Sequence, residues 1–189
     1  MGKVYVIQTG QTALEAQSRI DAVAGSPLTD GGIQAVRHCA AQLRELGVSD
    51  VIAGSGEAER HSAKLAAKEL GAKVRTEQGL RELDFGLWQG LTVEEIRKRQ
   101  PKLYRDWLES PTSVRPPGGE TLEEARGRLR AALKQILKRY RNSVPLLVLP
   151  PVMRGLMECV ARDLQTDAIW QNVETEFAWA DYEINGNGL

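Results

Sequence analysis

Residues 144–149 form an uninterrupted apolar run, VPLLVL, which limits the fold of the chain more than any other feature. A strand with one face in water alternates apolar and polar side chains, whereas a strand that is buried on both faces is apolar throughout. The run therefore predicts a central strand of a sheet that helices cover on both sides. Pro150 and Pro151 follow directly and predict a helix start, because the amide hydrogen that proline lacks has no partner at the first helical position.

The rest of the chain repeats a strand, a turn and a helix. Residues 4–7 form a short apolar run that ends in the turn QTGQT, and SDVIAGSGEAER has the same organisation. Since ligands bind beyond the carboxyl ends of strands in open α/β sheets, the side chains of QTGQT are candidate site residues. The alternation of strands and helices predicts the α/β class.

Three longer helices are predicted from apolar residues at helical spacing: 30–46, a helix that reaches about residue 70, and one that starts after Thr121 and reaches about Tyr140. Thr92 with Glu95, and Thr121 with Glu124, match the capping box that begins many helices.

Length and charge exclude several functional classes. The 189 residues predict a single domain, 1–189, and the 25 basic and 25 acidic residues cancel, which favours neither nucleic acid nor an anionic membrane. No apolar run approaches the roughly 20 residues that span a bilayer. The first strand starts at residue 3, which leaves no room for a signal peptide, so we expect a cytoplasmic protein. Cys39 and Cys159 lack metal-ligand spacing and are interpreted as buried thiols, so no metal or cofactor is expected.

Six segments in order carry a resemblance to a known family: VYVIQTGQT, RIDAVAGSPLTDGGIQAV, GSGEAERHSAKLAA, LRELDFGLWQG, PPGGETLEEARGRL and VPLLVLPPVMRGL. The chain resembles the histidine phosphatase superfamily, in its phosphoglycerate mutase-like branch. The resemblance implies a three-layer α/β/α sandwich with a mostly parallel central sheet. It also implies a loop and helix excursion at about 84–120 over the cleft.

The chain departs from this family at its reactive positions. Family members form a phosphohistidine in an Arg-His-Gly-Glu signature, which here reads QTGQ and places Thr9 at the nucleophile. The family's second histidine corresponds to Leu149. Arg60 matches the position of a second phosphate-binding arginine, and Glu82 matches the acid that protonates the leaving group. No catalytic residue is therefore expected by the family mechanism.

The physical cost of these replacements is large. Hydrogen bonds from charged groups contribute roughly 1.5–3 kcal/mol each, so losing three cationic donors weakens phosphate binding by about 5 kcal/mol or more, on the order of a thousandfold. Thr9 lacks an adjacent general base or metal that would activate its hydroxyl. His38 and His61 lie within predicted helices and are interpreted as surface or packing residues.

We expect a catalytically inactive member of the family with a binding or regulatory role, whose site contains Gln8, Thr9, Gln11, Arg60 and Glu82. Its partner is expected to be a small polar ligand or another protein. The alternative is a residual phosphatase in which Glu82 activates water and Arg60 holds the anion. For these two residues a simple ion pair that satisfies both charges is the favoured interpretation. A third interpretation is a structural subunit that pairs with an active paralogue or, as a homodimer, with itself near LTVEEIRKRQPKLYRDWLE.

Overall fold

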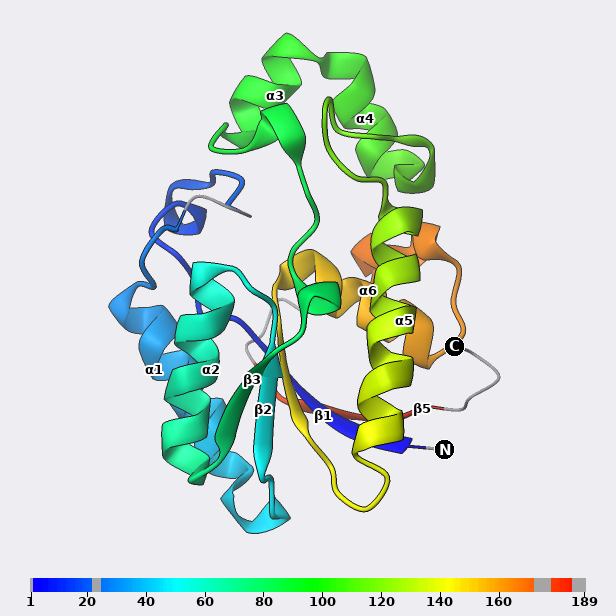
Figure 1. Ribbon diagram of the computed structural model, residues 1–189. Helices are drawn as coiled ribbons and strands as arrows, with labels where there is room; N and C mark the ends of the chain where they lie inside the picture. Colours follow the sequence, from blue (N-terminus) through cyan, green and yellow to red (C-terminus); the bar gives the residue numbers. More distant parts are fainter. Residues whose placement is uncertain (1, 22–24, 172–177, 185–189) are drawn as a thin grey trace.

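The computed structural model describes residues 2–21, 25–171 and 178–184. In this part of the chain a five-stranded sheet has the order β3-β2-β4-β1-β5 (Figure 1). Four strands are parallel and β5 is antiparallel to β1, which confirms the predicted α/β class and the mostly parallel sheet. The strands are β1 (Gly2–Gln8), β2 (Asp50–Ala53), β3 (Lys73–Thr76), β4 (Leu146–Leu149) and β5 (Ala180–Ile184).

Helices cover both faces of the sheet and make the predicted three layers (Figure 1). One layer contains α1 (Asp30–Gln42) and α2 (Glu57–Leu70), which pack on each other. The other contains α5 (Leu122–Arg139) and α6 (Pro151–Ala161). The described part also has α3 (Val93–Arg99), α4 (Pro101–Glu109) and the short 3-10 helices η1 (Glu15–Gln17), η2 (Arg44–Leu46), η3 (Gln78–Leu80), η4 (Gly86–Trp88), η5 (Pro111–Ser113) and η6 (Thr166–Gln171).

The central strands are buried on both faces, as the apolar run predicted. Every residue of β4 is fully buried. In β1, Val4 and Val6 face the core that contains α5 and α6, whereas Tyr5 and Ile7 face the core that contains α1 and α2. This alternation follows from the two-residue period of a strand, and it lets one sheet serve two hydrophobic cores.

Two element boundaries differ from the prediction. The helix expected over 30–46 ends at Gln42, and a 3-10 turn follows before Gly47 adopts a positive φ of 68°. The apolar run starts at residue 144 but β4 starts at Leu146, since Pro145 has no amide hydrogen to donate to a neighbouring strand. Its carbonyl still accepts a hydrogen bond from the Tyr5 amide at 3.0 Å.

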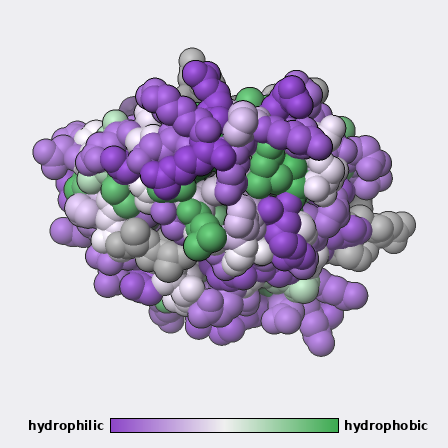
Figure 2. Space-filling model, turned by 90° about the horizontal axis from the view of Figure 1, so that it is seen from above, coloured by the Kyte–Doolittle hydropathy of each residue, from purple (hydrophilic) through white to green (hydrophobic). Residues whose placement is uncertain are grey.

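The segment from η4 to η5 lies beyond the carboxyl edge of the sheet (Figure 1). Trp107 attaches it to the main body, because its ring contacts Phe85, just before the segment, and Trp170 of η6, with centroids 6.0 and 5.0 Å away. The same ring packs on Trp88 within the segment, at 5.8 Å. Figure 2 shows the molecule from this side, mostly hydrophilic with small separate hydrophobic areas. Among the described residues, no helix is long and apolar enough to cross a membrane.

Candidate functional site

The carboxyl ends of β1 and β4 lie next to each other in the sheet. Gln8 pairs with Leu149 in the parallel register, and the Thr9 amide donates to the Leu149 carbonyl at 2.9 Å. The two positions that the family resemblance singled out, Thr9 and Leu149, are therefore neighbours. Leu149 is fully buried and Thr9 is 3% exposed.

A cavity of about 30 Å³ opens beside these strand ends. Its walls come from the turn after β1, the loop before α1, the start of α2, and the segments that follow η3 and β4. Among the described residues that line it, five are carboxylic acids and none is an arginine, lysine or histidine. The lining consists of Thr9, Thr12, Glu15, Asp21, Gly25, Ser26, Glu57, Ala58, Glu59, Glu82 and Pro150.

Glu82 is one of two fully enclosed acids in this lining and is only 6% exposed. Its two carboxyl oxygens accept hydrogen bonds from backbone amides, Leu83 N at 2.6 Å and Val152 N at 3.1 Å. Val152 lies in the first turn of α6, where amide groups have no partner within the helix. Burial nevertheless raises the pKa of Glu82 from 4.5 to about 8, because desolvation of the charged form outweighs the two amide hydrogen bonds and the nearby Arg128. The carboxyl is mainly protonated at neutral pH.

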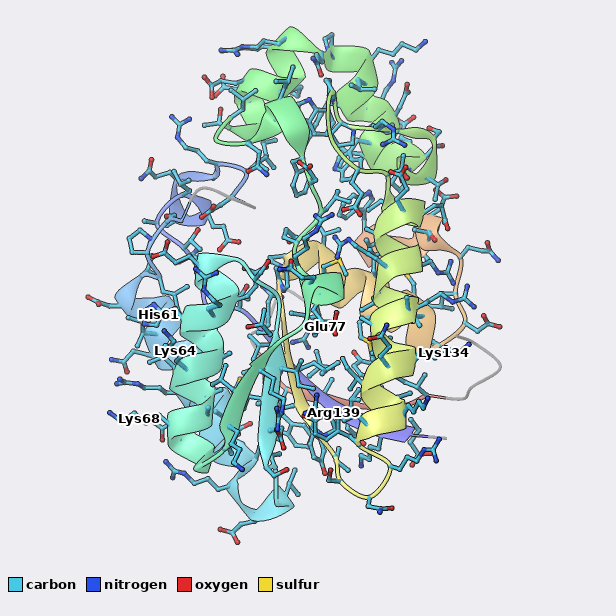
Figure 3. All side chains as sticks on the ribbon, in the orientation of Figure 1. His61, Lys64, Lys68, Glu77, Lys134 and Arg139 are labelled. Atoms are coloured by element: carbon cyan, nitrogen blue, oxygen red, sulfur yellow. The ribbon has the colours of Figure 1, made fainter. Side chains whose placement is uncertain are left out.

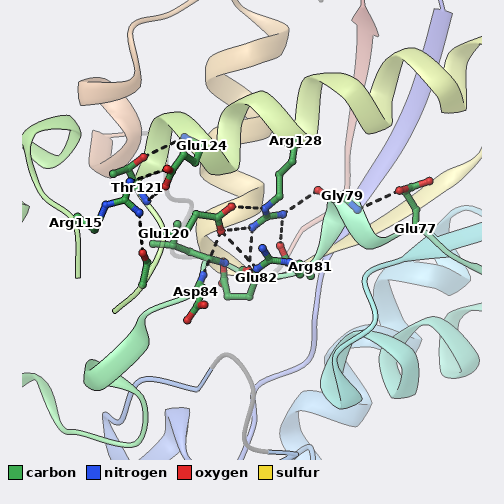
Figure 4. Close-up of polar contacts among 12 residues, drawn as sticks. Glu77, Gly79, Arg81, Glu82, Asp84, Arg115, Glu120, Thr121, Glu124 and Arg128 are labelled. Carbon is green, nitrogen blue, oxygen red and sulfur yellow. Dashed lines mark hydrogen bonds and ion pairs between the residues drawn. The ribbon is translucent and has the colours of Figure 1, made fainter. Parts of the chain in front are cut away.

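Arg128 on α5 holds the backbone that carries Glu82 (Figure 4). Its guanidinium donates to the carbonyls of Gly79, Arg81 and Glu82 at 2.9, 2.7 and 3.0 Å. It also binds both carboxylate oxygens of Glu120, at 2.8 and 3.0 Å. Because the guanidinium group is planar, it fixes the direction as well as the length of these hydrogen bonds. The irregular segment after η3 therefore has a defined position.

Glu59 forms the next wall of the cavity and is 3% exposed. Its Oε1 accepts from the Glu82 amide at 3.2 Å, and burial raises its pKa. Gly56 makes room for this carboxylate, because a Cβ atom there would lie 1.6 Å from Glu59 Oε2. At Gly54 a Cβ atom would instead lie 2.7 Å from the Cα of Arg81. The sequence GSGE after β2 thus permits the side chain of Glu59 to turn inward.

Two further acids come from the segment after β1. Glu15 accepts from the Thr12 amide at 2.8 Å, its own amide donates to the Thr12 hydroxyl, and burial raises its pKa. Within the described residues, the buried Oδ2 of Asp21 accepts no hydrogen bond.

The structure brings only part of the predicted site together. Thr9 and Glu82 line the cavity, whereas Gln8, Gln11 and Arg60 do not. Gln8 ends β1 half-buried, and the exposed Gln11 accepts from the Thr29 amide at 2.8 Å through its backbone carbonyl.

Arg60 is exposed on α2 and donates to the Ser55 carbonyl. It lies with Glu57, His61 and Lys64 at a separate surface hollow. The ion pair considered between Glu82 and Arg60 is not formed, because both oxygens of Glu82 face backbone amides. A role for Arg60 in ligand binding stays a prediction.

The chain has two histidines, and both lie on exposed helix surfaces. His38 on α1 contacts Gln42, with 3.0 Å between the Nε2 atom of the histidine ring and the side-chain amide nitrogen of the glutamine. His61 lies with Lys64 and Lys68 along the outer side of α2 (Figure 3). Neither lines the cavity beside Thr9.

Sequence reasoning missed four of the five acids: Glu15, Asp21, Glu57 and Glu59. The sequence did contain a signal for Glu57 and Glu59 on α2. Both follow a strand and a turn of small residues, which places them at the carboxyl edge of the sheet. For the other two, the chain between β1 and α1 shows no periodicity that would place a side chain.

The family assignment follows from comparison with known proteins. The family model of the histidine phosphatase superfamily (branch 1) matches residues 4–186. The chain therefore belongs to the histidine phosphatase superfamily.

Two relatives and one solved structure illustrate this membership. The bifunctional protein Rv2228c of Mycobacterium tuberculosis is 33% identical over 147 residues, 77% of this chain but only 40% of that protein. The probable phosphoglycerate mutase GpmB of Enterobacter sp. (strain 638) is 31% identical over 83% of this chain and 73% of its own length. The structure of Bacillus stearothermophilus YhfR aligns with a TM-score of 0.91 and 21% identity, over 97% of this chain and 92% of that one. At 21% identity, the likeness to YhfR shows a shared fold and nothing more.

Proposed function

We propose that this chain is a catalytically inactive member of the histidine phosphatase superfamily that keeps the fold and uses its cleft for binding. One observation carries the proposal: Thr9 follows the first strand, and both histidines of the chain lie on exposed helix surfaces outside the cavity. A phosphohistidine cannot form on a threonine, and a threonine hydroxyl needs a neighbouring base to act as a nucleophile.

The charge of the cavity supports the same proposal. Phosphoryl transfer depends on cationic donors that stabilise the equatorial oxygens of the phosphoryl group. The part of the lining that the structure describes supplies five carboxylic acids and no cationic side chain. An anionic phosphate would meet repulsion from every carboxyl that is ionised.

A second candidate function rests on Glu82. A carboxyl group with a pKa of about 8 is protonated at neutral pH, which is the state of a general acid and not of a base that activates water, as the sequence-based alternative had it. A residual phosphatase would then lose activity as the pH rises through about 8, because Glu82 would no longer hold the proton.

Hydrolysis of p-nitrophenyl phosphate by the wild type, Glu82→Gln and Arg60→Ala separates the two functions. We expect no turnover above buffer in any of the three, with circular dichroism confirming that each is folded. Turnover by the wild type that is lost in Glu82→Gln and declines above pH 8 would overturn the proposal. Loss of that turnover in Arg60→Ala as well would support the alternative in which this residue holds the anion. Glu94→Gln, at an exposed acid that pairs with Lys98, serves as the matched control.

A further inference from the structure

We infer that a hollow formed by α3, α4 and the chain around η1, the α3–α4 hollow, binds an acidic amphipathic helix of a partner protein. Both helices lie at the end of the molecule beyond the carboxyl edge of the sheet (Figure 1). The volume of the hollow is about 740 Å³. The inference goes beyond the proposed function, because the described residues that line this hollow and those that line the cavity beside Thr9 are different.

The helix α4 is apolar on two sides. Leu103 and Trp107, four residues apart, pack against the core that contains α5 and α6. Pro101, Tyr104 and Leu108 have the i, i+3, i+7 spacing of one helix face, and all three line the α3–α4 hollow. Leu108 is 52% exposed, so the described part of the chain leaves this second face partly uncovered.

Val93 on α3 gives the hollow a second exposed apolar wall. It is 39% exposed and lines the same space as Leu108. Single exposed apolar residues are common, but two that line one hollow form the kind of apolar area that marks an interaction site. The Val93 amide donates to the Ser18 carbonyl at 3.3 Å, which joins α3 to the chain around η1. The walls are therefore held in place before a partner arrives, and binding costs little ordering entropy.

Two arginines determine the charge of the hollow. Arg97 on α3 and Arg105 on α4 both line it and are exposed. Within the described part of the chain, neither guanidinium group forms a hydrogen bond or an ion pair. Glu94 is the one acid in the described lining, and Lys98 pairs with it at 2.8 Å. The unpaired charge is therefore positive, and a carboxylate can bind each arginine through two parallel hydrogen bonds.

An apolar surface next to two unpaired cations suits an amphipathic helix that carries carboxylates. In helix-in-groove binding, apolar residues at i, i+3 and i+7 enter the groove, and charged residues at its edge set the orientation. An anionic membrane suits the site less, because a broad, flat surface does not enter a hollow. A second copy of the chain also suits it less, because two-fold symmetry would bring the same pair of arginines of both copies together.

The test selects helices of about 18 residues from a phage-displayed library against the full chain. The library fixes leucine at i, i+3 and i+7 and varies the other positions among glutamate, glutamine and lysine. We expect the enriched sequences to carry a net negative charge. Enrichment of neutral or basic sequences, or no enrichment, would overturn the inference.

Four variants locate the binding, with fluorescence anisotropy of the most enriched peptide as the readout. Leu108→Ala removes an apolar contact and Arg105→Gln removes a charge; each should weaken binding by about tenfold. Leu87→Ala is the matched apolar control, 75% exposed and outside the described lining. Lys102→Gln is the matched charge control, exposed on the same helix and also outside that lining. Each control should change affinity by less than about twofold, and losses equal to those of the test variants would place the binding elsewhere.

Three further measurements separate the other occupants. Raising sodium chloride from about 50 to about 500 mM should weaken peptide binding by about tenfold, and an affinity independent of salt would contradict the role of the arginines. A dimer in light scattering that Leu108→Ala dissociates would assign the hollow to a second copy. Binding to phosphatidylserine vesicles that Leu108→Ala and Arg105→Gln both abolish would assign it to a membrane. Either assignment would overturn the inference, whereas phosphatase turnover bears on the proposed function alone.

Discussion

At Glu82, a protonated carboxyl inside the protein makes stability depend on pH. Its pKa is about 8 in the folded chain, whereas the ordinary value of a glutamate, which applies to the unfolded chain, is 4.5. Between these values the folded protein holds a proton that the unfolded protein has released. The free energy of unfolding should therefore fall as the pH rises from about 5 to about 8, by up to roughly 1.4 kcal/mol for each unit of pKa difference. Chemical denaturation of the wild type over this pH range measures the slope.

Glu82→Gln is the matched variant for this prediction. The amide nitrogen of glutamine cannot accept a hydrogen bond, so one of the amides of Leu83 and Val152 loses its acceptor, at a pH-independent cost of about 1–3 kcal/mol. The slope with pH should become flatter, and the remainder reflects Glu15 and Glu59, whose pKa values burial also raises. An unchanged slope would show that Glu82 is ionised in the folded protein.

The residue types alone did not predict that acidic side chains, and not Arg60, line the cavity. Successive residues on a helix point about 100° apart, so when Glu59 turns inward Arg60 faces the solvent. The family resemblance pointed to Arg60 at the start of this helix, whereas the residues of that turn that line the cavity are Glu57, Ala58 and Glu59. Which of these side chains enters the cavity depends on the backbone at Gly54 and Gly56, and no local pattern in the sequence determines it.

The start of α5 offers a test at the scale of one element. The Thr121 hydroxyl accepts from the Glu124 amide at 3.2 Å, and the Glu124 carboxylate accepts from the Thr121 amide at 2.8 Å. Thr121→Ala should lower the free energy of unfolding by about 1 kcal/mol, because one amide at the helix start loses its acceptor. Thr121→Ser keeps the hydroxyl and should cost less than half as much. Equal losses in urea denaturation would mean that the methyl group, not the cap, stabilises this end.

Elements were predictable where the signal is local. The capping boxes at Thr92 and Thr121 are both present, and Pro151 occupies the first position of α6 as predicted. The end of α1 was not predictable, because the apolar spacing continues to Leu46 although the backbone tightens into a 3-10 turn after Leu43. Such a change depends on how the chain enters β2, which is tertiary information.

At the scale of the whole molecule, we predict that the segment from η4 to η5 unfolds together with the sheet. Trp107 on α4 is 6% exposed, and its ring packs against Trp88 within the segment, against Phe85 just before it, and against Trp170 of η6 in a distant part of the chain. The indole N–H of Trp170 also donates to the Trp107 carbonyl at 2.8 Å. Contacts of this kind join the segment to the core that contains α5 and α6.

The wild type should therefore show one transition in urea, with tryptophan fluorescence and far-ultraviolet circular dichroism coinciding. Trp107→Ala should lower the free energy of unfolding by about 3–5 kcal/mol, because a large buried ring leaves a cavity. Leu108→Ala, on the same helix but 52% exposed, should cost less than about 0.5 kcal/mol and controls for changes in helix propensity. Two separate transitions in the wild type, or equal losses in the two variants, would mean that this segment folds independently of the sheet.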